Sequence, residues 1–114
     1  MEDRTYYVNT KEDLKLCMKS LPYFILKFTA TWCTPCKRIQ PVFNELFNTL
    51  PPEYAYVVVD IDTGKSIANM FRIKSVPTFI HMAKGQGEEL IVGSNEDQLK
   101  RFFINVRKTY DSQK

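Results

Sequence analysis

The strongest constraint on the fold is the alternation of short apolar runs with stretches of helical periodicity. Residues 23–29 and 56–59 are almost continuously apolar and rich in aromatic and β-branched residues, which is typical of short strands buried on both faces. Between them, apolar residues recur at helical spacing over residues 39–50, which predicts an amphipathic helix. A strand, a helix and a second strand in this order predict a parallel βαβ unit.

The remaining patterns extend this order to β-α-β-α-β-α-β-β-α. Further strands are expected at residues 6–8, within 75–82 and at 89–92, and further helices at 10–20, 63–71 and 94–110. The glycine-containing segment 84–87 predicts a hairpin turn, which joins the last two strands in an antiparallel pair. We therefore predict an α/β protein with a mixed central β-sheet flanked by helices on both faces.

Local signals indicate where several helices begin and end. Thr10 followed by Asp13, and Ser94 followed by Asp97, resemble capping boxes at the starts of the first and last helices. Pro51 and Pro52 are expected to stop the second helix.

Composition and charge are those of one ordinary globular domain over residues 1–114. The chain is 44% hydrophobic and 25% charged, which excludes a disordered or collagen-like chain. Sixteen basic and thirteen acidic side chains leave a net charge of +3 without runs of one sign, so we expect no nucleic-acid groove. No apolar run is long enough to cross a membrane, and residues 1–6 do not resemble a signal peptide. We expect a cytoplasmic monomer, or an organellar one if a transit peptide has been removed.

Cysteine spacing is the main chemical signal. The chain has three cysteines, Cys17, Cys33 and Cys36, and an odd number makes a poor disulfide framework. The C-x-x-C pair indicates either redox chemistry or metal binding. A closed zinc site needs four ligands, and the other candidates, Cys17 and His81, each stand alone, so we favour the redox interpretation and expect no metal.

The position of the pair assigns different roles to the two thiols. Cys33 falls where a buried strand passes into a helix, and the helix N-terminus favours an anion and lowers the pKa of a thiol. Pro35 suits the first helical turn, where its missing N–H costs nothing. Cys36 lies one turn further in and should be shielded. We expect Cys33 to attack a target disulfide as the more exposed nucleophile, and Cys36 to resolve the mixed disulfide.

Beyond the cysteine pair, the chain resembles the thioredoxin family over nearly its whole length. The segment 32–37, Trp-Cys-Thr-Pro-Cys-Lys, is similar to the W-C-G-P-C-K motif of that family. Pro41 resembles the proline that kinks the second helix, and residues 76–78 resemble the loop whose proline is cis and faces the cysteines. Gly85 and Gly93 resemble glycines of the hairpin and of the docking surface.

This resemblance implies a thioredoxin fold and the reduction of protein disulfides without a bound cofactor. Electrons would come from NADPH through a thioredoxin reductase-like partner, and the substrates would be disulfide-containing proteins. The resemblance also implies a cis bond before Pro77 and a substrate strand that pairs with the backbone beside it. The residues implied to frame that strand are Trp32, Thr34, Pro35, Val76, Pro77 and Gly93.

Two positions depart from the family pattern. Thr34 replaces the usual glycine between the cysteines, which leaves the redox potential open. Lys27 replaces a buried aspartate six residues before the first cysteine. Either Lys27 is buried with a depressed pKa and alters proton handling at Cys36, or its ammonium group reaches solvent far from sulfur.

Other polar or reactive residues have structural interpretations. Cys17, on the apolar face of a helix, is expected to be an inert core residue rather than a redox sensor. His81 is expected to be half-exposed packing within a strand. Asp60 and Asp62 are expected to form a turn and a helix cap rather than a metal site. Trp32 is expected to be partly exposed and to serve in docking.

Two other functions remain as alternatives. A redox-inert thioredoxin-fold binding module would hold a partner on the surface around Pro77, but such a module needs no thiols. An oxidase or isomerase domain of a larger protein is disfavoured by the Thr-Pro pair between the cysteines and by the absence of a signal peptide.

Overall fold

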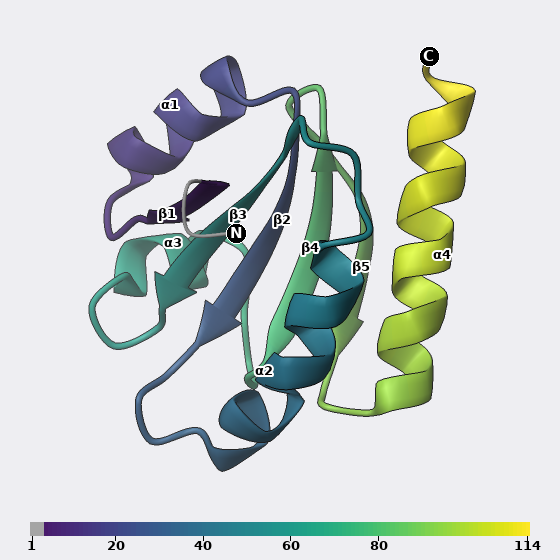
Figure 1. Ribbon diagram of the computed structural model, residues 1–114. Coiled ribbons are helices and arrows are strands. Elements are labelled where there is room, and N and C mark those ends of the chain that lie inside the picture. The colour runs from purple at the N-terminus through teal and green to yellow at the C-terminus, as the bar shows by residue number, and fades with distance from the viewer. Residues whose placement is uncertain (1–3) are drawn as a thin grey trace.

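The computed structural model describes residues 4–114, which form five strands and four helices in the predicted order (Figure 1). Their bounds are β1 Thr5–Tyr7, α1 Lys11–Ser20, β2 Tyr23–Thr29, α2 Thr34–Phe47, β3 Tyr54–Asp60, α3 Lys65–Met70, β4 Thr78–Ala83, β5 Gln86–Val92 and α4 Glu96–Ser112. Within these residues, no helix combines the length and apolar character needed to cross a bilayer.

The strands form one mixed sheet in the order β1-β3-β2-β4-β5. Strand β3 runs parallel to both β1 and β2, whereas β4 runs antiparallel to β2 and to β5. The βαβ unit and the terminal antiparallel pair are therefore confirmed.

Helices cover both faces of this sheet, with α1 and α3 on one side and α2 and α4 on the other (Figure 1). Alternate residues of β2 supply the two cores. Ile25 packs in the cluster that contains Phe43 of α2 and Phe102 of α4, and Leu26 packs in the cluster that contains Leu14 of α1. Both faces of β2 are covered, which explains its almost continuous apolar run, with Lys27 as the charged exception.

The predicted start of α1 agrees with the structure, whereas the predicted start of α4 and the predicted end of α2 do not. The Thr10 hydroxyl accepts a hydrogen bond of 3.1 Å from the Asp13 N–H, so the predicted N-cap of α1 is confirmed. The predicted cap of α4 is wrong: Asn95, not Ser94, is the N-cap, and its side chain accepts from the Gln98 N–H. Helix α2 ends at Phe47, before the two prolines, so the prediction that they stop it is also wrong.

The hairpin between β4 and β5 is tighter than expected. Lys84 and Gly85 both have positive φ, at 52° and 83°, and Ala83 pairs directly with Gln86. Two positive-φ residues are typical of a two-residue turn that matches strand twist. Strand β5 therefore starts at Gln86 rather than at residue 89.

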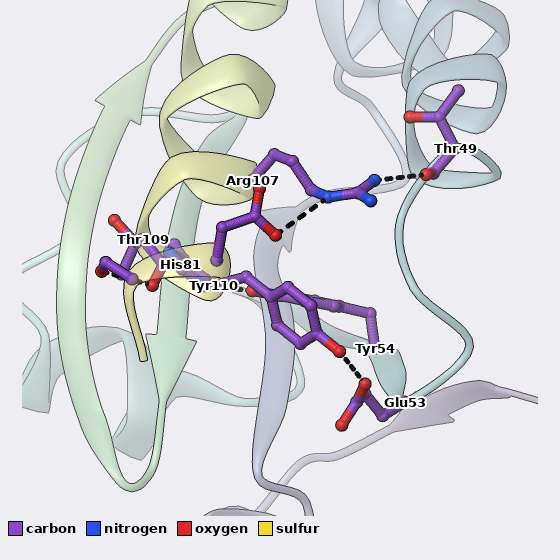
Figure 2. Close-up of polar contacts among 9 residues, drawn as sticks. Thr49, Glu53, Tyr54, His81, Arg107, Thr109 and Tyr110 are labelled. Atoms are coloured by element: carbon purple, nitrogen blue, oxygen red, sulfur yellow. Dashed lines mark hydrogen bonds and ion pairs between the residues drawn. The ribbon is translucent and has the colours of Figure 1, made fainter. Parts of the chain in front are cut away.

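His81 is buried, so the expectation of half-exposed packing is wrong. Its side chain is 1% exposed, and its Nε2 atom shares a hydrogen bond of 2.7 Å with the hydroxyl of Tyr54 (Figure 2). Burial lowers the pKa of His81 to about 4. Nearby, the Tyr110 hydroxyl donates to Glu53, which ties α4 to the start of β3.

Candidate redox site at the start of α2

The C-x-x-C pair forms a disulfide between Cys33 and Cys36 at the point where β2 leads into α2. Their Cα atoms are 5.3 Å apart, within the usual range for a disulfide. Cys33 is the N-cap of α2, with Thr34 and Pro35 in its first turn, as the sequence predicted. Proline fits there because the first N–H groups of a helix have no partner within the helix.

One backbone N–H group points at the sulfur of Cys33. The Cys36 N–H donates a hydrogen bond of 3.2 Å to Cys33 Sγ. In the reduced protein this donor and the positive end of the helix dipole favour a thiolate on Cys33. The geometry therefore distinguishes the two sulfur atoms electrostatically.

Exposure does not distinguish the two cysteines in the disulfide form. Cys33 and Cys36 are each 2% exposed, so the expectation that Cys33 is the more exposed is wrong for this oxidised state. Ala30, Ile61 and Val76 pack against the pair. The disulfide is therefore enclosed in a small apolar cluster.

The loop before β4 and the loop after β5 meet beside the disulfide. The Val76–Pro77 bond is cis, which confirms that prediction. The Gly93 N–H donates a hydrogen bond of 2.8 Å to the Pro77 carbonyl. Among residues 4–114, no backbone hydrogen bond reaches the N–H or C=O of Val76, and this residue is only half-buried. Its N–H and C=O therefore have no backbone partner within the described residues.

The six residues expected to frame a substrate lie around the disulfide, at different depths. Trp32 and Thr34 are exposed, Pro35, Val76 and Gly93 are half-buried, and Pro77 is buried. The side chain of Trp32 is 63% exposed, which confirms the expectation that it is partly exposed. Arg38 of α2 donates to the Ser94 hydroxyl and ties α2 to the loop that holds Gly93.

Asp62 is a site residue whose role the sequence interpretation missed. Its Oδ2 atom accepts a hydrogen bond of 2.9 Å from the indole N–H of Trp32. Its own N–H donates to Asp60 Oδ1, which confirms the predicted turn. The predicted helix cap is wrong, because Gly64 is the N-cap of α3 and no side chain caps it. No local pattern signals a contact between residues 30 positions apart.

Lys27 is buried rather than extended into solvent. Its side chain is 2% exposed, and its Nζ donates a hydrogen bond to Gln40 Oε1 of α2. The Nζ atom also lies 6.0 Å from the ring centre of Phe43 and 5.7 Å from that of Phe79. Burial lowers the pKa of Lys27 to about 8. The interpretation in which the ammonium group escapes to solvent is therefore wrong.

The third cysteine and the acidic residues form no further reactive centre. Cys17 is a free thiol in the core between α1 and the sheet. Burial is the main cause that raises its pKa, and the negative charge of nearby Asp13 raises it further. A raised pKa lowers the thiolate fraction and hence reactivity. Over residues 4–114, no cluster of three or more His, Cys, Asp or Glu side chains is arranged to hold a metal.

Sequence and structure comparisons agree on one family. Residues 6–105 match the family model described as Thioredoxin. Thioredoxin H5 of Oryza sativa subsp. japonica is 33% identical over 111 residues, which is 96% of this chain and 79% of that protein. Thioredoxin H3 of Arabidopsis thaliana is 35% identical over 88 residues, or 77% of this chain and 74% of its own length.

Solved structures show the same likeness in three dimensions. Oxidised mitochondrial thioredoxin 3 from Saccharomyces cerevisiae superposes with a TM-score of 0.80 at 27% identity, covering 89% of this chain and 94% of that one. A thioredoxin from Nicotiana alata superposes with a TM-score of 0.77 at 27% identity, covering 90% and 91% of the two chains.

Proposed function

Because this chain belongs to the thioredoxin family, we propose that Cys33 is its attacking thiol and Cys36 its resolving thiol. The chain is a protein-disulfide reductase that works by dithiol–disulfide exchange, and thioredoxins need no bound cofactor for this reaction. The observation that carries the two roles is the Cys36 N–H directed at Cys33 Sγ at the start of α2.

The exchange proceeds in two steps that transfer two electrons to the substrate. The Cys33 thiolate attacks one sulfur of the substrate disulfide, forms a mixed disulfide and releases the other substrate sulfur as a thiolate, which takes a proton. Cys36 then loses its proton and attacks Cys33 Sγ. This step closes the Cys33–Cys36 disulfide and releases the second substrate thiol.

The residues around the Cys33–Cys36 disulfide are proposed to dock the substrate. An extended substrate segment would pair with the open N–H and C=O groups of Val76, as in strand addition to a sheet edge. Trp32 and Thr34 would contact it from the side of α2, and Gly93 from the loop after β5. Gly93 has a φ of 106°, which favours glycine, and the space beside it is open because nothing lies within 4 Å of a Cβ built there.

The family implies a reductase that recharges the dithiol and disulfide-containing proteins that consume it. We propose that the electrons come ultimately from NADPH through a thioredoxin reductase-like donor. We also propose a cytoplasmic location, which agrees with the free thiol of Cys17 because thiols stay reduced in that compartment.

Lys27 is proposed to take part in proton handling at Cys36. Its pKa of about 8 lies close to neutral pH, so a fraction of the amine is neutral and able to accept a proton. Gln40, its hydrogen-bond partner, lies one helical turn beyond Cys36 on α2. In Lys27→Met, the pH profile of the reduction rate should shift, whereas an unchanged profile would leave water as the proton acceptor.

A trapping experiment tests the two thiol roles. Cys36→Ser should accumulate a mixed disulfide with a protein substrate, and peptide mapping should place it on Cys33. Cys33→Ser should trap nothing, and Cys17→Ala should behave like the unchanged protein. An adduct mapped to Cys36 or Cys17 would contradict the assignment.

Redox equilibration separates the reductase from a redox-inert binding module. After incubation in glutathione buffers and alkylation, the mass should change in a single two-electron step confined to Cys33 and Cys36. A pair that stays reduced in every oxidising buffer would favour the binding module.

A further inference from the structure

A pocket of about 520 Å³ lies on the α2 face of the sheet, and neither cysteine of the disulfide lines it. Its walls come from β1, β2, β3 and α2, and the residues that matter for a ligand are Tyr7, Lys27, Gln40, Asn44, Tyr56 and Val58. On this face α4 packs against β5, at the opposite edge from β1. The β1–β3 edge beside α2 is therefore left without a covering helix (Figure 1).

Charge is unbalanced in this pocket. Among residues 4–114, no Asp or Glu lines the pocket, and the ion pair found in that range joins Arg107 to Asp111 on α4. Lys27, 98% buried, has the neutral Gln40 and two aromatic rings as partners. A buried cation without a counter-ion is costly, and the lowered pKa of Lys27 reflects that cost.

The polar groups around Lys27 are suited to donate hydrogen bonds. The Tyr56 hydroxyl donates to Gln40 Oε1 at 3.5 Å, a long contact that a closer acceptor would replace. Asn44 Oδ1 already accepts from Gln40 Nε2 at 2.8 Å, so the amide nitrogen of Asn44 is the group left for a ligand. One cation and neutral donors together form a site for an anion.

The mouth of the pocket is apolar. Tyr7 is 78% exposed at the edge strand β1, and the half-buried Val58 lies beside it in register. An aromatic ring and an aliphatic side chain at the entrance favour a ligand with an apolar body behind its charged group.

We propose that this pocket binds a small free carboxylate with an apolar substituent, its carboxylate on Lys27 and Tyr56 and its apolar part against Tyr7 and Val58. This inference shares Lys27 with the proposed proton handling at Cys36, but its test measures ligand binding and not disulfide reduction. A divalent cation is a poor occupant because the lysine repels it.

The test compares benzoate with benzyl alcohol, its uncharged analogue of similar size. The full-length protein carries ¹³C-labelled lysine, and NMR follows both binding and the titration of the Lys27 side chain. Benzoate should shift Lys27, raise its pKa and bind at least about tenfold more tightly than benzyl alcohol. Equal binding of the two probes, or shifts confined to other parts of the chain, would overturn the proposal.

Variants locate the two parts of the ligand. Lys27→Met should weaken benzoate binding by about tenfold or more, whereas Lys108→Met, at an exposed position on α4, should not. If Lys27→Met does not fold, Tyr7→Ala serves instead, because Tyr7 is exposed. Tyr7→Ala should weaken benzoate but not acetate, and equal weakening of both anions would contradict the apolar contact.

Two further measurements exclude other occupants. Inorganic phosphate that binds as tightly as benzoate would make this a general anion site and overturn the carboxylate assignment. The double variant Glu2→Gln, Asp3→Asn should leave the pKa of Lys27 unchanged. A fall in that pKa would show that carboxylates of the chain itself serve as the counter-ion.

Discussion

The indole N–H of Trp32 donates a hydrogen bond of 2.9 Å to Oδ2 of Asp62. This contact joins the residue that precedes the reactive cysteine to the turn that follows β3. Trp32 is 63% exposed, so packing alone does not hold its ring. Asp62 therefore orients the exposed aromatic side chain that we propose for substrate docking.

Removing this acceptor should loosen Trp32. In Asp62→Ala, kcat/KM for a protein disulfide should fall about threefold to tenfold, the effect of one hydrogen bond. Trp32 is the only tryptophan in the sequence, so fluorescence anisotropy should report its faster motion directly. Asp62→Asn keeps a side-chain oxygen that can accept this hydrogen bond, so it should retain much of the activity and of the restraint on Trp32. Asp111→Ala, at the far end of α4, should behave like the unchanged protein. Unaltered anisotropy in Asp62→Ala would show that the ring is held by other contacts.

Lys27 should make stability rise with pH in the alkaline range. Its pKa is about 8 in the folded chain and 10.5 in a model peptide, so between these values the unfolded chain binds more protons. The free energy of unfolding therefore gains up to about 3 kcal/mol as pH rises through this window. Urea midpoints at a series of pH values should show that slope, and the difference curve against Lys27→Met isolates it from the tyrosines. Parallel curves for the two proteins would mean that Lys27 titrates normally.

His81 should produce a corresponding effect in acid. Burial lowers its pKa from 6.5 to about 4, so the unfolded chain binds the extra proton between these values. Stability should fall by up to about 3 kcal/mol as pH drops through this window. His81→Gln keeps a polar partner for Tyr54 but does not titrate, and its urea midpoints should lose that part of the acid sensitivity. If both proteins lose stability equally between pH 6.5 and 4, the carboxylates carry the effect instead.

Asn95 should stabilise the start of α4, and Ser94 should not. Asn95→Ala removes the acceptor of the Gln98 N–H and should lower the free energy of unfolding by about 1 kcal/mol. Ser94→Ala removes an exposed contact with Arg38 and should cost less than about 0.5 kcal/mol. Chemical denaturation of the two variants provides the comparison, and a larger loss in Ser94→Ala would favour the cap predicted from the sequence.

Periodicity predicted the order of strands and helices because it reflects local geometry. The apolar run of β2 and the stripe of α2 indicated a covered strand and an amphipathic helix before any contact was known. The N-cap of α1 followed from Thr10 and Asp13, since a cap bonds within one helical turn. The start of β5 was not predicted correctly, because this edge strand is polar and exposed over its first residues and shows no apolar alternation there.

The sequence by itself determined the dithiol motif, its place at the start of a helix and the family resemblance, because all three depend on neighbouring or regularly spaced residues. Only the tertiary structure decided the partners of the unusual polar residues: Gln40 for Lys27, Tyr54 for His81 and Asp62 for Trp32. These pairs are separated by 13, 27 and 30 positions in the chain. Their hydrogen bonds exist only because the sheet brings β2, β3 and β4 side by side and packs α2 across them, which no local pattern records.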